Sequence, residues 1–300
     1  MIETLAESAA QLAREAGAFL RRAYRETSTV EHKGTVDLVT EADRGAERLI
    51  LDGIAAQWPD HDVLAEETGA RPGVSGAPAS SYRWVVDPLD GTVNFAHRLP
   101  HFSVLLAVQI AKADGYDTVV AVTYDPMRDE LFVARKGMGA SLNGEEIGVS
   151  TAEALIHTTL ATGFGYDRLF GAPDNHREFC RLNLLSRGVR RFGSAGLDLA
   201  YVACGRFDGY WEYGLNPWDL TGGVLLVGEA GGRVTQMNGT PYTEGAATIM
   251  ATNGVLHRAL GDALGAACAV PANSREDLLR FLPDSVRSRV RPGADGEVIS

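Results

Sequence analysis

The segment at residues 84–95 carries the side chains best suited to chemistry. It reads Trp-Val-Val-Asp-Pro-Leu-Asp-Gly-Thr-Val-Asn-Phe, so an apolar run is followed by two carboxylates, Asp87 and Asp90. The proline between them interrupts a regular helix or strand, which lets both acids point to one place. Gly91 permits a tight turn, and the amides of Gly91 and Thr92 would open a short helix that favours an anion. The segment therefore predicts carboxylate ligands for a metal ion beside amides for a phosphate group.

Three further stretches carry acidic residues in a similar setting. Upstream, residues 33–43 read Lys-Gly-Thr-Val-Asp-Leu-Val-Thr-Glu-Ala-Asp, and residues 65–68 read Ala-Glu-Glu-Thr. Downstream, residues 216–223 read Asn-Pro-Trp-Asp-Leu-Thr-Gly-Gly. A single Asp-x-x-Asp pair is usually a solvated turn, but an apolar strand, paired acids and a phosphate-binding turn rarely coincide. Together these stretches resemble the inositol monophosphatase family, and the resemblance extends over residues 5–268.

The resemblance implies a metal site built from acidic side chains. Its four carboxylates would be those of Glu66, Asp87, Asp90 and Asp219, and the main-chain carbonyl of Leu89 would complete one position. Ligands that are all oxygen atoms suit Mg²⁺, with two or three ions per site. Without cations, two such charges ~4 Å apart would repel by about 4 kcal/mol at an effective dielectric constant of ~20. The resemblance also implies inhibition by lithium at the metal position beside the leaving group.

A relay for proton transfer follows from the same resemblance. The carboxylate of Asp37 would accept a hydrogen bond from the hydroxyl of Thr92, and this hydroxyl would orient a water held by a metal ion and Glu66. That water would attack phosphorus directly, so no covalent enzyme intermediate is expected. Lys33 would support a loop beside a third ion, although a plain surface role for this lysine is equally open.

Recognition of substrate hydroxyls is expected from the second half of the chain. The resemblance assigns it to Glu212 and to the run Gly193, Ser194 and Ala195, while Gly91 and Thr92 would bind the phosphate. Glu212 lies in an aromatic strand, so a cross-strand packing role is a rival interpretation. The implied activity is Mg²⁺-dependent hydrolysis of a small sugar or polyol phosphate monoester, with inositol monophosphate as the first candidate.

Several other functions stay open at this stage. Within the same superfamily the chain could be a fructose 1,6-bisphosphatase, a histidinol phosphatase or a phosphatase of 3'-phosphoadenosine 5'-phosphate. Outside enzymology it could be a regulatory binding protein that retains the fold. A complete set of mutually repelling carboxylates disfavours this last possibility, because a site without turnover has no physical need for them.

Composition excludes some classes of protein. The 28 Lys plus Arg and 39 Asp plus Glu give a net charge of −11, which disfavours extensive nucleic-acid binding. The cysteines are odd in number and lie in apolar, helical contexts, which indicates a reducing cytoplasm: Cys180, Cys204 and Cys268. No leader pattern and no apolar run of ~18 residues is present, so neither export nor membrane insertion is expected.

The first half of the chain predicts two helices and a substantial sheet. Apolar residues recur at helical spacing between Leu5 and Leu20, and a second helix opens near Thr40 and ends at Trp58. Gly and Pro in residues 69–78 indicate an exposed loop. A hairpin turn is expected at Asn143-Gly144, and strands are expected at residues 63–65, 84–86, 103–110, 119–124 and 131–134.

The second half predicts alternating strands and helices. Strands are expected near 160, 189, 209–212, 233–237 and 248–251, and helices at 175–185, 196–204, 218–229 and 256–267. The resulting expectation is an α/β (α+β) protein with a layered αβαβα sandwich and its site between two lobes. A second copy of the chain is the expected partner, in a homodimer. The lobes would comprise residues 1–148 and 149–271, followed by a partly disordered extension at 272–300 that includes a possible helix near 274–277.

Overall fold

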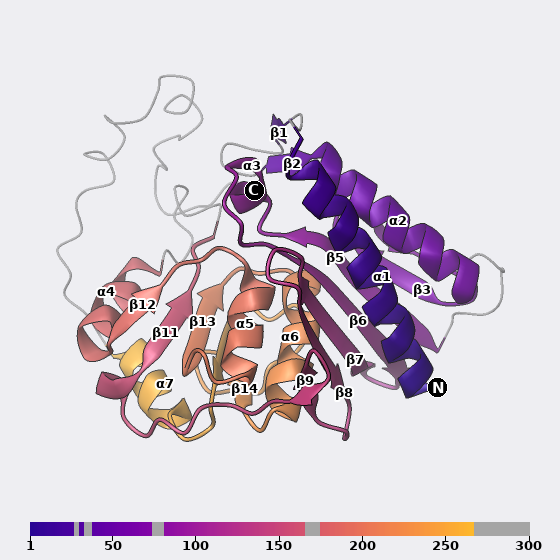
Figure 1. The fold of residues 1–300 in the computed structure, drawn as a ribbon. Helices are drawn as coiled ribbons and strands as arrows, with labels where there is room; N and C mark the ends of the chain where they lie inside the picture. The colour runs from indigo at the N-terminus through magenta and orange to yellow at the C-terminus, as the bar shows by residue number, and fades with distance from the viewer. Residues whose placement is uncertain (27–29, 33–37, 74–80, 166–174, 267–300) are drawn as a thin grey trace, which may run out of the picture.

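Two helices cover one face of the first β-sheet (Figure 1). They are α1 (Ile2–Ala23) and α2 (Glu41–Gln57), which confirm the two helices expected at the start of the chain. The apolar stripe of α1, including Leu5, Leu12 and Leu20, is fully buried against α2 and the sheet. The computed structural model describes residues 1–26, 30–32, 38–73, 81–165 and 175–266.

The first sheet has eight strands in the order β10-β9-β8-β7-β6-β5-β3-β4. Alternate residues of β7 face different cores: Val120 and Val122 pack with α1 and α2, whereas Ala121 packs with the helices on the other face. The strands are β3 (Asp62–Ala65), β4 (Gly69–Arg71), β5 (Tyr82–Asp90), β6 (Ser103–Lys112), β7 (Gly115–Asp125), β8 (Glu130–Arg135), β9 (Ala140–Leu142) and β10 (Glu145–Glu146).

Helices α5 (Ala195–Ala203) and α6 (Pro217–Glu229) lie between the two sheets (Figure 1). Every residue of α5, including Asp198, is buried, because the helix is mostly apolar and has a sheet on each side of it. Helix α6 packs on β5 to β9 of the first sheet and on β14 and β15 of the second. The core between the sheets therefore joins the two halves of the chain.

The second sheet has five strands in the order β12-β11-β13-β15-β14. Its outer face packs on α4 (His176–Leu185) and α7 (His257–Gly265) through a third core that contains Trp211, Met250 and Leu260. The layers are thus αβαβα, as predicted. The strands are β11 (Thr159–Thr162), β12 (Gly188–Arg190), β13 (Gly209–Tyr213), β14 (Arg233–Thr235) and β15 (Thr248–Thr252).

The smaller elements include one correction. Residues Gly69–Arg71 were expected in a loop but pair with β3 as the edge strand β4. The turn at Asn143-Gly144 is confirmed, since both residues have positive φ angles between β9 and β10. The other short elements are β1 (Val30–His32), β2 (Leu38–Thr40), α3 (Thr92–Ala96) and the 3₁₀ turn η1 (Leu155–His157).

Some expectations lie outside the described residues. These are the positions of Lys33, Asp37 and Cys268 and the extension at 272–300 with its possible helix. The boundary between lobes at residue 148 stays a prediction. Cys180 and Cys204 are free thiols. Among the described residues, no helix combines the length and the apolar character needed to cross a bilayer.

Candidate active site

A β-bulge at the end of β5 brings two acidic side chains to the same side of the sheet. Asp87 pairs with Leu105 of β6, and Asp90 pairs with Ser103, so β5 has one more residue than β6 across this interval. In a regular strand, residues three apart would face opposite sides. The extra residue cancels that alternation, and Pro88 is accommodated because it lies in the bulge.

Both aspartates open onto a cavity of about 150 Å³ between the two halves of the chain. Glu66 reaches it from the end of β3, Glu212 from β13 and Asp219 from the first turn of α6. The cavity unites every predicted site residue that the structure describes, namely Glu66, Asp87, Leu89, Asp90, Gly91, Thr92, Gly193, Ser194, Ala195, Glu212 and Asp219.

Asp87 is buried among other carboxylates. Its Oδ1 accepts a hydrogen bond from the Leu89 amide at 3.0 Å, and its Oδ2 has no hydrogen bond to a described residue. Burial raises the pKa of Asp87 well above its usual value, and the charges of Glu66, Asp90 and Asp219 raise it further. A cation in the cavity would reverse this penalty.

Asp90 joins the first sheet to the start of α5. Its Oδ2 accepts hydrogen bonds from the Ser194 hydroxyl at 2.5 Å, the Ser103 hydroxyl at 3.0 Å and the Gly196 amide at 2.9 Å. Its Oδ1 accepts only the Ala195 amide, at 3.1 Å. Burial raises the pKa of Asp90, although these bonds oppose the rise. Oδ1 therefore retains a lone pair for another ligand, while the Ser194 side chain is already engaged.

Asp219 is held by the start of α6. Pro217 opens the helix, and the Asn216 amide donates to Asp219 Oδ2 at 2.7 Å in a capping box. Burial raises the pKa of Asp219; the Asn216 amide lowers it, and neighbouring carboxylates including Asp90 and Glu66 raise it again. Oδ1 of Asp219 has no hydrogen bond within the described part of the chain.

The Thr92 hydroxyl contacts a buried carboxylate of α2. Thr92 Oγ1 lies 2.9 Å from Asp43 Oδ1, with the Leu89 carbonyl as a second acceptor at 3.1 Å. Asp43 is buried in the first turn of α2. Asp37, the predicted acceptor, lies outside the described residues. Within the described part of the chain, the accepting carboxylate is that of Asp43.

Glu212 lies at the other end of the cavity, under a glycine. The Tyr210 hydroxyl donates to Glu212 Oε2 at 2.5 Å. A Cβ atom at Gly163 would lie 2.0 Å from Glu212 Oε1, so only glycine leaves room for this carboxylate. Burial raises the pKa of Glu212 to about 7, although Tyr210 and Arg191 lower it.

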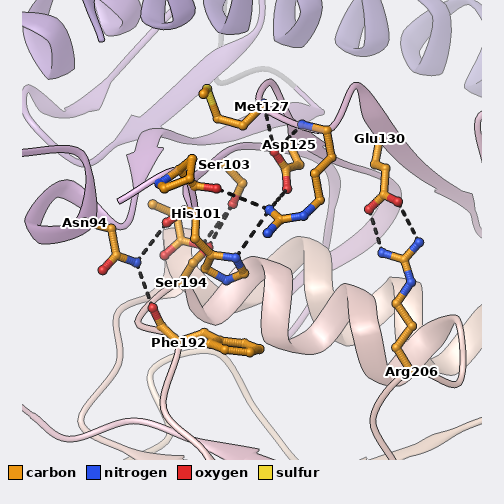
Figure 2. A network of polar contacts seen from close by, with 12 residues as sticks. Asn94, His101, Ser103, Asp125, Met127, Glu130, Phe192, Ser194 and Arg206 are labelled. Carbon is orange, nitrogen blue, oxygen red and sulfur yellow. Dashed lines mark hydrogen bonds and ion pairs between the residues drawn. The ribbon is translucent and has the colours of Figure 1, made fainter. Parts of the chain in front are cut away.

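Asn94 is a site neighbour that the sequence did not reveal. Its amide nitrogen donates to the carbonyls of His101 at 2.8 Å and Phe192 at 2.7 Å. Figure 2 shows these two bonds fanning out from Asn94, with Ser103 and Ser194 close by. Asn94 belongs to α3 and Phe192 to the loop before α5, so this side chain holds that loop against the turn at Gly91.

The donor set fits a hard divalent cation. All candidate ligand atoms are carboxylate or carbonyl oxygens, and Asp87 and Asp219 each retain one oxygen that no described residue hydrogen-bonds. Within the described ranges, no three acidic, His or Cys side chains are already gathered as a closed metal-binding cluster. The carboxylates instead surround a shared cavity, which suits ions that also need room for water and substrate.

Comparison with known proteins agrees with this geometry. The sequence profile of the inositol monophosphatase family matches residues 1–268. The inositol-1-monophosphatase of Synechocystis is 44% identical over 266 residues, 88% of this chain and 90% of the relative. Nus factor SuhB of Escherichia coli is 46% identical over 233 residues, 77% of this chain and 84% of the relative. The structure of an Anabaena inositol monophosphatase superposes with a TM-score of 0.77 at 43% identity, covering 87% and 95% of the two chains.

A layered fold with a carboxylate-lined cavity at the edge of its first sheet defines a class of phosphate-ester hydrolases, and the chain is a phosphoric monoester hydrolase of this class. Within it, the protein belongs to the inositol monophosphatase family.

Proposed function

We propose that the protein hydrolyses a small sugar or polyol phosphate monoester in a Mg²⁺-dependent reaction, with inositol monophosphate as the first candidate. One observation carries the proposal: carboxylates from β3, β5 and α6 converge on one cavity that also contains the start of α3 and Glu212. The name of the Synechocystis relative supports inositol 1-phosphate as the substrate. Fructose 1,6-bisphosphate, histidinol phosphate and 3'-phosphoadenosine 5'-phosphate remain the alternatives.

Two or three Mg²⁺ ions would be held by oxygen ligands around the cavity. The ligands are the carboxylates of Glu66, Asp87, Asp90 and Asp219 and the carbonyl oxygen of Leu89. When bound, such ions make a water more acidic and stabilise the leaving oxygen. The retained lone pairs of the aspartates support this assignment, because each can bind an ion without losing its local hydrogen bond.

Thr92 and Asp43 are proposed to accept the proton of the attacking water in two linked transfers. Thr92 Oγ1 donates to Asp43 Oδ1, so the lone pairs of the hydroxyl remain free to accept from a water in the cavity. As the water attacks phosphorus, the hydroxyl proton can move toward Asp43 while Thr92 accepts the proton of the water. Glu66 lines the same cavity and would orient this water from the opposite side. Asp37 and Lys33 stay predictions for this half of the site.

The substrate would lie between α3 and β13. The amides of Gly91 and Thr92 open α3 and would bind phosphate, because the first N–H groups of a helix have no partner within it. Glu212 would accept hydrogen bonds from substrate hydroxyls, together with main-chain groups of Gly193, Ser194 and Ala195. The first half of the chain would thereby bind the phosphate, and the second half would bind the substrate hydroxyls.

Phosphate release from a panel of phosphomonoesters tests the proposal. Purified protein is assayed with the four substrates named above, with Mg²⁺ and with EDTA, and with Li⁺ added to the Mg²⁺ reaction. We expect Mg²⁺-dependent release with the highest kcat/KM for inositol 1-phosphate, and inhibition by Li⁺. Release that is equal in EDTA, or none from any ester, would exclude the proposal.

The remaining proposals concern location and partners. We propose a homodimer in the cytoplasm, which light scattering and fractionation can test. The net charge of −11 supports the absence of extensive nucleic-acid binding. The prediction on nucleic acid needs a direct test, because several relatives are named Nus factor SuhB. Gel-shift titration with RNA at physiological salt tests it, and binding below micromolar concentration would contradict it.

A further inference from the structure

Arg191 introduces a positive charge into an acidic cavity. It lies in the loop between β12 and α5 and contributes to the cavity wall. Among the described residues that line the cavity, it is the one basic side chain. The other charged side chains of the lining are all acidic: Glu66, Asp87, Asp90, Glu212 and Asp219.

The glycine two positions later leaves room for the Arg191 side chain where it lies. A Cβ atom at Gly193 would be 2.2 Å from Arg191 Nη1, so the guanidinium folds over Gly193 and no side chain fits beneath it. Gly193 also has a φ of +79°, which glycine adopts without strain. The adjacent carbonyl of Phe192 is held by the Asn94 amide at 2.7 Å. The arginine is thus directed to the cavity by a supported loop.

The guanidinium has unused hydrogen-bonding capacity. Arg191 is exposed, and the described residues provide it with no ion pair or hydrogen bond. Glu212 and Asp198 lie close enough for its charge to lower the pKa of both carboxyls against the effect of burial. Neither approaches to ion-pair distance, so the planar donors of the guanidinium remain available to a ligand.

The reacting phosphate already has partners elsewhere in the cavity. The start of α3 and the metal-binding carboxylates lie at the end of β5, whereas Arg191 lies on the loop before α5. A guanidinium binds phosphate or carboxylate through two parallel hydrogen bonds, which polyol hydroxyls cannot match in charge. We propose that Arg191 binds a second anionic group where a substrate carries one, and that within a matched pair of phosphomonoesters the enzyme therefore favours the member with that group. The inference rests on the proposed function and narrows its substrate class.

Matched substrate pairs separate this role from general charge balance. One pair is fructose 1,6-bisphosphate and fructose 1-phosphate, which differ by a second phosphate. The other is 3-phosphoglycerate and glycerol 3-phosphate, which differ by a carboxylate. Within each pair, kcat/KM of the ester with the second anionic group is divided by kcat/KM of the ester without it. This ratio is measured for the wild type, Arg191→Ala and Arg191→Lys. Arg190→Ala is the matched control, since Arg190 is exposed, adjacent and outside the cavity lining.

We expect Arg191→Ala to lower the ratio at least tenfold in one or both pairs, and the pair affected identifies the second group. The ratio for Arg191→Lys should lie between those of Arg191→Ala and the wild type, because lysine keeps the charge but lacks the planar guanidinium. Arg190→Ala should leave both ratios within twofold. Unchanged ratios in Arg191→Ala, or an equal fall in Arg190→Ala, would overturn the inference.

Binding measurements keep this test independent of turnover. Dissociation constants for the same pairs are measured by calorimetry with Ca²⁺ in place of Mg²⁺, since Ca²⁺ also binds oxygen ligands. The proposed function fails if no ester releases phosphate with Mg²⁺. The inference on Arg191 fails if the affinity ratio of each pair is the same in Arg191→Ala and in the wild type.

Discussion

The Ser194 hydroxyl donates a hydrogen bond to Asp90 Oδ2 at an Oγ–Oδ2 distance of 2.5 Å, and this bond links the first sheet to the helix layer between the sheets. Both side chains are buried. Three other donors reach the same carboxylate, from Ser103, Ala195 and Gly196. Asp90 is thus both a candidate metal ligand and the acceptor at the start of α5.

Removal of the Ser194 hydroxyl should weaken the junction of the two halves. Ser194→Ala deletes one hydrogen bond to a buried charge, which typically costs about 1.5–3 kcal/mol. We expect the thermal midpoint to fall by several degrees. Ser141→Ala is a suitable control, since the hydroxyl of Ser141 in β9 bonds to no described residue. Equal midpoints for Ser194→Ala and the control would contradict a structural role for this bond.

Asp87→Asn should separate activity from stability. The substitution removes a proposed ligand, so Mg²⁺-dependent phosphate release should fall at least a hundredfold. Without metal, it also removes a buried carboxyl whose pKa is raised by burial and by its neighbours. The thermal midpoint in EDTA at pH 7.5 should therefore match or exceed that of the wild type. Asp52→Asn, at an exposed position on α2, should change neither property.

The wild type should gain stability from Mg²⁺ in the same experiment. An ion at 100 times its dissociation constant stabilises the folded state by about 2.7 kcal/mol, or roughly 5 °C for a chain of this size. Asp87→Asn should lose most of this gain. A Mg²⁺-induced rise of the same size in both proteins would exclude Asp87 as a ligand.

Thr92→Val tests the proposed proton relay. Valine keeps the shape of threonine but cannot bond to Asp43 or to water. We expect kcat to fall by about 10²–10⁴ with little change in KM, as for loss of a general base. Thr92→Ser should retain most activity, and Asp43→Asn should resemble Thr92→Val. Wild-type kcat in Thr92→Val would remove the hydroxyl from the mechanism.

Acid should destabilise the protein through His257. Thr235 Oγ1 donates to the Gln236 carbonyl, so it accepts from His257 Nε2 at 2.9 Å, and Thr252 Oγ1 lies 2.9 Å from His257 Nδ1. Burial lowers the pKa of His257 to about 4, with a further lowering by Arg233, so the ring is neutral at pH 7.

The sign of the pH effect follows from that lowered pKa. The unfolded chain takes up a proton near pH 6.5 and the folded protein only near pH 4. The contribution of His257 is complete above pH 6.5 and is lost as the pH falls toward 4, by at most about 1.4 kcal/mol per pH unit. Urea unfolding of the wild type and His257→Asn at pH 7.5 and 5 measures it. The substitution should lower stability at pH 7.5 and reduce the difference between the two pH values; an undiminished difference would contradict the assignment.

Much of the fold could be predicted because its elements are long and periodic. Helix α1 and strand β6 have clear apolar patterns, and both lie where expected. Short pieces such as β4 were missed, because three residues with Gly and Arg carry no strand pattern and pair only when β3 is beside them. Their structure depends on tertiary context.

The candidate site was predictable where it consists of side chains in recognisable motifs. The contact of Asp43 with Thr92 could not be predicted from spacing, because it depends on α2 beginning at Glu41 and directing its first turn toward Thr92. The role of Asn94 was equally hidden. Its partner is the main-chain carbonyl of Phe192, 98 residues away, and the sequence carries no signal for a contact with a main-chain atom.

The bulge at the end of β5 makes the spacing of Asp87 and Asp90 inseparable from the irregular pairing with β6. Deleting one residue between them would restore a regular ladder, yet it would also shift the second acid and its four hydrogen-bond donors out of alignment. Transplanting this acidic pair onto another scaffold would consequently require the irregular ladder itself, whereas exchanging the intervening side chains alone would not reproduce the arrangement.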